Sequence, residues 1–263
     1  MDPLTVAAHW EANADAWTRH SRAGYDVYRD ALNTPAFLAM LPPITGLQGL
    51  DIGCGEGSNT RQLARLGAQL TAIDIAPTFV RHAQESEANE PLGIRYLHGD
   101  GMALPFAEAS FDFATAFMSL MDMPHQDRVL AEAKRVLKPS GFLQFSILHP
   151  CFATPGRKVM RDEGGNVLGI EVREYFRITD GEIESWRFGA APAEEKAKVE
   201  PFRVPRFHHT LSDWINLLVA TGFRIEHMHE PGVDEETAKA VPYLADTYIA
   251  PLFLHMRVRK PVR

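Results

Sequence analysis

The chain has 263 residues, a formal net charge of −7, 45% hydrophobic residues and 23% charged residues, a composition typical of an ordinary folded domain. Apart from the segment MRVRKPVR at residues 256–263, its Lys and Arg residues are scattered, which argues against a broad nucleic-acid-binding face. The early acidic residues and the absence of an apolar run of about 20 residues predict neither a signal peptide nor a membrane span, so we expect a cytoplasmic protein.

The N-terminal part of the chain is predicted to be helical. Trp10 and Trp17 recur at the spacing of one helix face, and a second helical stretch covers residues 25–40. The Leu-Pro-Pro break at residues 41–43 ends this region. We expect residues 1–45 to form a helical cap that acts as a lid.

The segment 46–150 alternates short apolar stretches with helical ones. This alternation predicts a mostly parallel sheet covered on both faces by helices. The predicted strands cover residues 50–52, 70–75, 94–98, 111–117 and 142–148, and the predicted helices cover residues 59–66, 78–87 and 126–137.

Residues 151–206 break the alternation and are interpreted as an insertion that selects the substrate. Residues 171–188 alternate as β-strands do, with a hairpin turn predicted at Asp180-Gly181. Residues 190–201 are polar and predict a mobile loop.

The segment 207–263 is expected to complete the core. It contains a predicted helix at 211–220 and predicted strands at 223–229 and 252–258. The fold class is therefore α/β: a doubly wound, mostly parallel seven-stranded sheet whose last strand is antiparallel, with an N-terminal helical lid and a β-rich insertion.

A glycine-rich turn follows the first predicted strand, in the segment GLDIGCGEGSNT at residues 49–60. Gly53, Gly55 and Gly57 allow a sharp turn and the close approach of a ligand to the backbone, and free amides at the next helix favour a negative group. On its own the pattern also fits a degraded dinucleotide fingerprint. Cys54 is interpreted as a small loop residue, and with Cys151 as the only other cysteine no disulfide framework is expected.

Two more acids follow successive predicted strands. Asp74 ends the second strand in LTAIDIAP, and Asp100 follows the third strand in YLHGDGMALPF. The carboxyl ends of parallel strands form the ligand crevice of a doubly wound sheet, and a carboxylate there can accept both hydrogen bonds of a ribose diol. We expect Asp51, Asp74 and Asp100 to converge on one ligand.

With these segments in order, residues 46–150 resemble a class I, Rossmann-like S-adenosylmethionine-dependent methyltransferase. The segments are LDIGCGEG, AIDIAP, GDGMALPF, SFDFATAFMSL and RVLKPSGFLQFS, and they look most like the small-molecule branch that includes ubiquinone- and menaquinone-pathway enzymes. The resemblance implies S-adenosyl-L-methionine as methyl donor, S-adenosyl-L-homocysteine as product and a small-molecule acceptor. It also implies that the glycine loop and Asp51 hold the methionine end, Asp74 the ribose and Asp100 the adenine amino group.

The full set of implied donor-binding residues lies mostly in the core. It comprises Asp51, Gly53, Cys54, Gly55, Gly57, Asp74, Ile75, Asp100, Gly101, Met102, Ala116 and Phe117, with Trp17 and Tyr25 from the helical lid. Aromatic rings in a lid can exclude water and lie against a cation.

A hydroxyl or carbon-acid acceptor also needs a general base. Many relatives carry a His pair after the fourth strand, where this chain has Met121-Asp122, so Asp122 is a candidate. His149, after the fifth strand, is the first choice, and His208 and His209 before a helix are further candidates. No metal ligand set is predicted.

Two alternative functions stay open at this stage. A nicotinamide-dependent oxidoreductase could use the same glycine turn, although Asp100 would then have no role and no Tyr-x-x-x-Lys relay is present. The second alternative is a methyltransferase that acts on a macromolecule, or a non-catalytic binding protein. The segment FMSLMDMP after the fourth strand lacks the Asn/Asp-Pro-Pro-aromatic pattern of enzymes that methylate base amines. A homodimer is open as well, since an added hairpin strand could pair between subunits.

Overall fold

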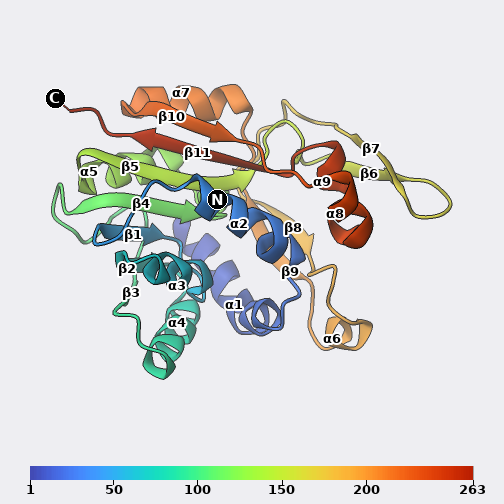
Figure 1. The fold of residues 1–263 in the computed structure, drawn as a ribbon, viewed down its shortest axis with the longest axis horizontal. Helices are drawn as coiled ribbons and strands as arrows, with labels where there is room; N and C mark the ends of the chain where they lie inside the picture. The colour runs from blue at the N-terminus through green and yellow to red at the C-terminus, as the bar shows by residue number, and fades with distance from the viewer. Residues whose placement is uncertain (263) are drawn as a thin grey trace.

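The computed structural model describes residues 1–262 and has a seven-stranded sheet at its centre (Figure 1). The strand order is β10-β11-β5-β4-β1-β2-β3. All neighbouring strands are parallel except β11, which is antiparallel to both β5 and β10. The predicted fold class, including the antiparallel last strand, is confirmed.

The strands of this sheet are β1 (Gln48–Ile52), β2 (Gln69–Asp74), β3 (Arg95–His98), β4 (Phe111–Phe117), β5 (Leu137–Leu148), β10 (Arg224–His229) and β11 (Phe253–Arg259). The helices are α1 (Pro3–Arg22), α2 (Thr34–Met40), α3 (Ser58–Arg65), α4 (Pro77–Asn89), α5 (Gln126–Val136), α6 (Ala193–Ala197), α7 (Leu211–Thr221), α8 (Glu235–Ala240) and α9 (Asp246–Ile249). Shorter turns of helix are η1 (Arg29–Asn33), η2 (Leu120–Asp122) and η3 (Pro242–Leu244).

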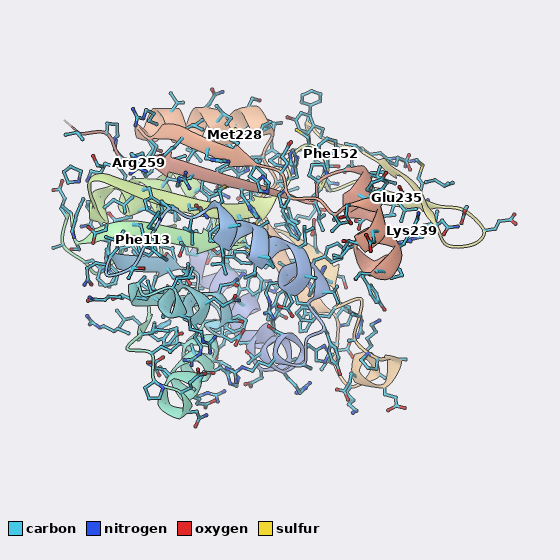
Figure 2. The ribbon with its side chains drawn as sticks, in the orientation of Figure 1. Phe113, Phe152, Met228, Glu235, Lys239 and Arg259 are labelled. Atoms are coloured by element: carbon cyan, nitrogen blue, oxygen red, sulfur yellow. The ribbon has the colours of Figure 1, made fainter. Side chains whose placement is uncertain are left out.

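Helices cover the two faces of the sheet with two separate apolar layers. One layer packs α5 and α7 against the sheet through buried residues such as Leu130 and Trp214. The other packs α3 and α4 against it and includes Leu63, Val80 and Phe113. Figure 2 shows Phe113 inside the molecule, whereas α8 lies at the opposite end from Arg259. Burial of both faces explains why the central strands are almost continuously apolar.

One predicted strand boundary was wrong. The strand expected at residues 142–148 begins at Leu137, directly after α5, because Leu137 already pairs with Phe111 and a bulge with Ser140 at φ 64° lets the ladder continue. The helical stretch predicted at 25–40 includes a π-helix at η1 before α2, a change of winding that no apolar spacing reveals.

The segment between β5 and α7 forms two hairpin-like pairs outside the main sheet. β6 (Lys158–Arg161) pairs with β7 (Val167–Glu171), and β8 (Glu182–Trp186) pairs with β9 (Phe202–Arg206). Asp180-Gly181 therefore does not turn a hairpin, as predicted, but leads into β8. The tight turn lies at 162–166, where the amides of Gly165 and Asn166 bond Asp162.

The predicted loop at 190–201 contains the short helix α6. Its first turn carries Glu194 and Glu195, which favour a helix N-terminus, and Lys196 Nζ donates to Gly189 O at 2.6 Å.

Within residues 1–262 we find no helix with the length and apolarity that a bilayer crossing requires.

Candidate active site

The glycine loop runs from the end of β1 to the start of α3 with three residues in left-handed conformations. Gly53, Gly55 and Gly57 have φ values of 76°, 56° and 87°. A Cβ on Gly53 would lie 2.5 Å from Ser119 Cβ, so this position must be glycine for packing, whereas a Cβ on Gly55 would meet open space. The loop thus presents bare backbone at Gly55 to the space beside it.

Asp51 holds the glycine loop in place through hydrogen bonds beneath it. Its two carboxylate oxygens accept from Thr60 Oγ1 at 2.6 Å and Thr115 Oγ1 at 2.8 Å, which join β1 to α3 and to β4. Burial raises the pKa of the Asp51 carboxyl, against these two hydrogen bonds. The arrangement accounts for the order of the loop.

Asp74 and Asp100 lie at adjacent strand ends, as expected. Asp74 accepts from the amides of Gly55 at 2.8 Å and Ala76 at 2.9 Å, and burial raises its pKa to about 6 against these bonds. Asp100 Oδ1 accepts from the Met102 amide at 2.8 Å. Each carboxylate keeps lone pairs for a ligand, since an ionised carboxylate can accept about four hydrogen bonds.

A cavity of about 770 Å³ opens over this edge of the sheet, a size typical of small-molecule sites. Its wall includes eleven residues of the predicted donor set: Trp17, Tyr25, Gly53, Cys54, Gly55, Asp74, Ile75, Asp100, Gly101, Met102 and Phe117. Asp51, Gly57 and Ala116 lie outside the wall. The three-carboxylate convergence is therefore corrected: Asp74 and Asp100 meet at the cavity, and Asp51 supports the loop beneath it.

The N-terminal helix closes one side of the cavity with aromatic side chains. Trp17 of α1 stacks on Trp186 of β8 with ring centroids 4.9 Å apart, and both rings line the cavity. Asn13 Nδ2 of α1 also donates to Arg203 O of β9 at 3.1 Å. The lid residues from two distant parts of the chain thus form one wall.

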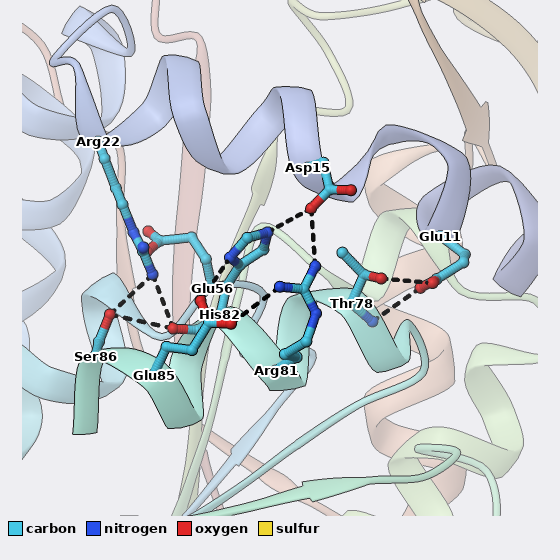
Figure 3. A network of polar contacts seen from close by, with 9 residues as sticks. All are labelled: Glu11, Asp15, Arg22, Glu56, Thr78, Arg81, His82, Glu85 and Ser86. Carbon is cyan, nitrogen blue, oxygen red and sulfur yellow. Dashed lines mark hydrogen bonds and ion pairs between the residues drawn. The ribbon is translucent and has the colours of Figure 1, made fainter. Parts of the chain in front are cut away.

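Polar contacts hold α1 on α4, as Figure 3 shows. Glu11 accepts from the Thr78 amide and hydroxyl at the start of α4, at 3.0 and 2.7 Å, while Asp15 contacts Arg81 and His82. Further along, the buried Glu56 of the glycine loop pairs with Arg22 at 3.1 Å and with Arg29 at 3.7 Å. The N-terminal helical segment is therefore tied directly to the loop.

The four candidate bases have different surroundings. His149 is buried, accepts the Cys151 amide at Nδ1 (3.1 Å) and contacts Glu230 at Nε2 (2.6 Å). Since Nδ1 is the acceptor, Nε2 carries the proton and donates it. Both nitrogens are thus engaged, and the ring does not line the cavity.

His208 and His209 also lie outside the cavity wall. His208 Nε2 bonds Tyr175 O at 3.0 Å. The His209 ring packs edge-on against Trp214 with centroids 6.1 Å apart, and burial lowers its pKa. A backbone carbonyl thus engages the His208 ring, and packing on Trp214 engages the His209 ring.

Asp122, in contrast, lines the cavity. It is 6% exposed, and its Oδ1 has no hydrogen-bond partner among the described residues. Burial raises the pKa of this carboxyl to about 7, although the charge of the nearby Arg206 acts in the opposite direction. The structure therefore brings one of the four candidates, Asp122, to the cavity.

Burial raises the pKa of the Cys54 thiol well above its ordinary value, which keeps the thiol protonated and a poor nucleophile. No cluster of three or more His, Cys, Asp or Glu side chains within residues 1–262 has the arrangement of a metal site.

Several cavity residues were not predicted from the sequence: Arg29, Ser119, Arg157, Glu184 and Arg206. Ser119 follows the SFDFATAF segment and its Oγ donates to Ile52 O at 2.7 Å, so its place after a strand end was the available signal. The others lie in the lid and the insertion, where no motif points to the cavity.

Comparisons with known proteins agree with this geometry. Residues 50–145 match a family described as "Methyltransferase domain". The chain is 31% identical over 147 residues to a malonyl-[acyl-carrier protein] O-methyltransferase of Pectobacterium atrosepticum, with 55% of this chain and 56% of that protein covered. It is 31% identical over 143 residues to a demethylmenaquinone methyltransferase of Thermobifida fusca, with 54% and 60% covered. The chain thus spans little more than half the length of these relatives.

A solved structure extends the likeness beyond the core. A S-adenosylmethionine-dependent methyltransferase from Mesorhizobium loti superposes with a TM-score of 0.67 at 27% identity, covering 86% of this chain and 96% of the other. The glycines of the loop and the acids Asp51, Asp74 and Asp100 lie within the residues 50–145 that match the family. Over residues 50–145 the chain is thus similar to the methyltransferase domain family, and over most of its length its fold is similar to that of the Mesorhizobium loti S-adenosylmethionine-dependent methyltransferase.

Proposed function

We propose that this protein transfers a methyl group from S-adenosylmethionine to a small-molecule acceptor. The observation that carries the proposal is one cavity whose wall includes the glycine loop, Asp74, Asp100 and Asp122. The donor supplies an activated methyl group on a sulfonium, so the protein mainly has to align the acceptor and exclude water.

The residues at the glycine loop fit such a donor. The open space beside Gly55 admits a ligand close to the backbone, and the carboxylates of Asp74 and Asp100 accept hydrogen bonds there. We assign Asp74 to the ribose hydroxyls and Asp100, with Gly101 and Met102, to the adenine. The Trp17–Trp186 wall keeps water from the cavity.

Asp122 is the general base in this proposal. A carboxyl whose pKa is about 7 is ionised in a substantial fraction of molecules at neutral pH and still binds a proton well. His149, the first choice from the sequence, is replaced in this role because Glu230 and the Cys151 amide occupy its ring.

We also propose a division of labour among four segments. Residues 46–150 and 207–263 form the donor-binding core, residues 1–45 form the lid, and residues 151–206 select the acceptor. Arg157, Glu184 and Trp186 of the last segment line the cavity, which supports the assignment.

Calorimetric titration with S-adenosylhomocysteine tests the proposal first. We expect one binding site per chain, and then transfer of radiolabelled methyl from S-adenosylmethionine to members of a small-metabolite pool. Failure of S-adenosylhomocysteine to bind would reject the function. Binding accompanied by methylation of tRNA or protein alone would reject the small-molecule acceptor.

A further inference from the structure

The cavity wall contains four buried polar atoms without a hydrogen-bond partner among residues 1–262. They are Asp122 Oδ1, Thr154 Oγ1, Arg157 Nε and Arg206 Nε. Burial of a polar atom without a partner costs free energy, and native proteins leave few such atoms. Four on one wall indicate that a ligand supplies the missing partners.

Asp122 and Arg206 belong to one local arrangement. The Phe207 amide donates to Met121 O at 3.0 Å, which fixes the end of β9 beside η2. Arg206 is close enough for its charge to lower the pKa of Asp122. The ion pair that Arg206 makes is with Glu184, at 3.1 Å through Nη2, and its Nε remains unpartnered. Two residues that line the same cavity therefore each have a buried polar atom without a partner among residues 1–262, a donor on Arg206 and a carboxylate oxygen on Asp122.

The chemistry of these two atoms selects the group that fits between them. Arg206 Nε–H can only donate, and an ionised Asp122 can only accept. A hydroxyl group satisfies both: its oxygen accepts from Arg206, its proton bonds Asp122, and a second lone pair remains for the methyl group. A neutral amine has one lone pair, so a bond from Arg206 would occupy the nucleophile. The reacting carbon of a carbon acid has no lone pair, so Arg206 could bond only an adjacent oxygen and would not hold the atom that receives the methyl group.

The pKa of the Asp122 carboxyl limits which kinds of hydroxyl group can transfer a proton to it. Proton transfer is efficient when the pKa values of base and acceptor are not far apart. Tyrosine, a phenol, has an ordinary pKa of about 10, within reach of a buried carboxylate, whereas an aliphatic alcohol is far less acidic. The cavity is also lined by aromatic rings, including Tyr28, Trp186 and Phe188, which suit a flat unsaturated ring.

Given the proposed function, we infer that this cavity methylates the oxygen of a phenolic or enolic hydroxyl held between Asp122 and Arg206. The hydroxyl O–H bond breaks and its proton passes to the Asp122 carboxylate. The oxygen forms the new O–CH3 bond as the S–CH3 bond of the sulfonium breaks, which leaves neutral S-adenosylhomocysteine. Arg206 acts as a positioning residue and stabilises the developing negative charge on the oxygen.

Three flat probes of matched size test this inference: para-cyanophenol, para-cyanoaniline and para-cyanoanisole. Each is titrated into the full chain saturated with S-adenosylhomocysteine, and affinity is measured by calorimetry. We expect the phenol to bind at least about tenfold more tightly than the amine and the ether, the difference that one charge-assisted hydrogen bond makes.

Substitutions test whether Asp122 and Arg206 cause the preference for the phenol. Asp122→Asn and Arg206→Met should each remove it, while Arg203→Met, an exposed arginine on the same strand, should keep it. Every variant must retain the wild-type affinity for S-adenosylhomocysteine, which shows that the fold and the donor end are intact.

The outcomes separate the two proposals. If S-adenosylhomocysteine does not bind, the proposed function fails. If it binds but the three probes bind equally, or none binds, or the phenol preference survives both substitutions, the assignment of a hydroxyl acceptor is overturned while the methyltransferase function stands.

Discussion

The loop end of the site (the glycine loop with Asp51 and Asp74) and its Asp122 end (Asp122 with Arg206) differ in their hydrogen bonding. At the loop end, Asp51 accepts from two threonine hydroxyls and Asp74 accepts from two backbone amides, so protein groups already satisfy these carboxylates. At the other end, Asp122 Oδ1 and Arg206 Nε have no partner among the described residues. The loop end is preorganised by the core, whereas the Asp122 end lacks partners that an acceptor would bring.

The difference has an energetic consequence. A satisfied polar group adds about 0.5–1.5 kcal/mol to stability, whereas a buried one without a partner costs about 1–3 kcal/mol. Substitutions at the Asp122 end are therefore expected to lower activity and raise stability. Substitutions at the loop end are expected to lower both. Substitutions at the two ends can test this contrast.

The largest effect is expected from Asp122→Asn on turnover. The amide cannot take up the proton, so the methylation rate should fall by roughly 10²–10⁴-fold, the usual contribution of a general base. In the unsubstituted protein the rate should rise with pH through about 7, where Asp122 loses its proton, and the variant should lack this rise. Initial rates across pH with an accepted substrate measure both.

Asp127→Asn is the matched control, because this exposed carboxylate on α5 lies outside the cavity wall. It should keep the wild-type rate and pH profile. A variant Asp122→Asn with full activity would move the base to another group.

The same substitution should stabilise the ligand-free protein at alkaline pH. Asp122 has a pKa of about 7 when folded and 3.8 ordinarily. Between these pH values the folded state holds a proton that the unfolded state has lost, so the contribution to stability falls as pH rises from about 4 to about 7. Above that range Asp122→Asn should raise the free energy of unfolding by roughly 2–4 kcal/mol, an upper range set by the size of the shift.

Urea unfolding of the ligand-free protein at about pH 9 and about pH 4 measures this gain. The two proteins should differ at the higher pH and be close to each other at the lower one. A loss of stability at high pH would show that Asp122 has a structural partner, and would remove the contrast between the two ends of the site.

Asp74→Ala probes the loop end. It deletes an acceptor for the donor's ribose in our assignment and leaves the amides of Gly55 and Ala76 without their partner. We expect the affinity for S-adenosylhomocysteine to fall by roughly 1–3 kcal/mol, measured by calorimetry. Glu108→Ala removes an exposed carboxylate and should leave affinity unchanged. Equal affinities in both variants would exclude Asp74 from the donor site.

The two ends also differed in how far the sequence predicted them. The glycine loop and Asp74 lie within short segments at strand ends, and the topology of a parallel sheet then places those ends together. The mostly parallel sheet with its antiparallel last strand could therefore be predicted, along with most of the loop end. The exception was Asp51, whose side chain turns to Thr60 and Thr115 beneath the loop.

The acceptor end could not be predicted because its parts meet only through tertiary packing. Arg206 reaches the cavity because β9 pairs with β8 and bonds η2 at Met121, contacts that leave no pattern in sequence. For the same reason, spacing could not reveal that His149 faces Glu230. The hairpin turn assigned to Asp180-Gly181 was wrong because the strand that pairs with β8 lies some fifteen residues further along, after α6.

The smallest effect is expected where the lid meets the loop. Glu56→Gln removes the charge that pairs with Arg22 and Arg29 but keeps the size of the side chain. Glu56 is buried, but Arg22 is 40% exposed and Arg29 keeps a second carboxylate in Asp30, so we expect stability to fall by about 1 kcal/mol. Because Glu56 lies in the glycine loop, donor dissociation should become a few times faster, as stopped-flow displacement would record. Glu85→Gln breaks an exposed pair with Arg81 on α4 and should leave that rate unchanged. If both variants release the donor at the wild-type rate, the ion pairs of Glu56 do not couple the lid to the loop end, and other contacts of α1, such as Trp17–Trp186, close the cavity.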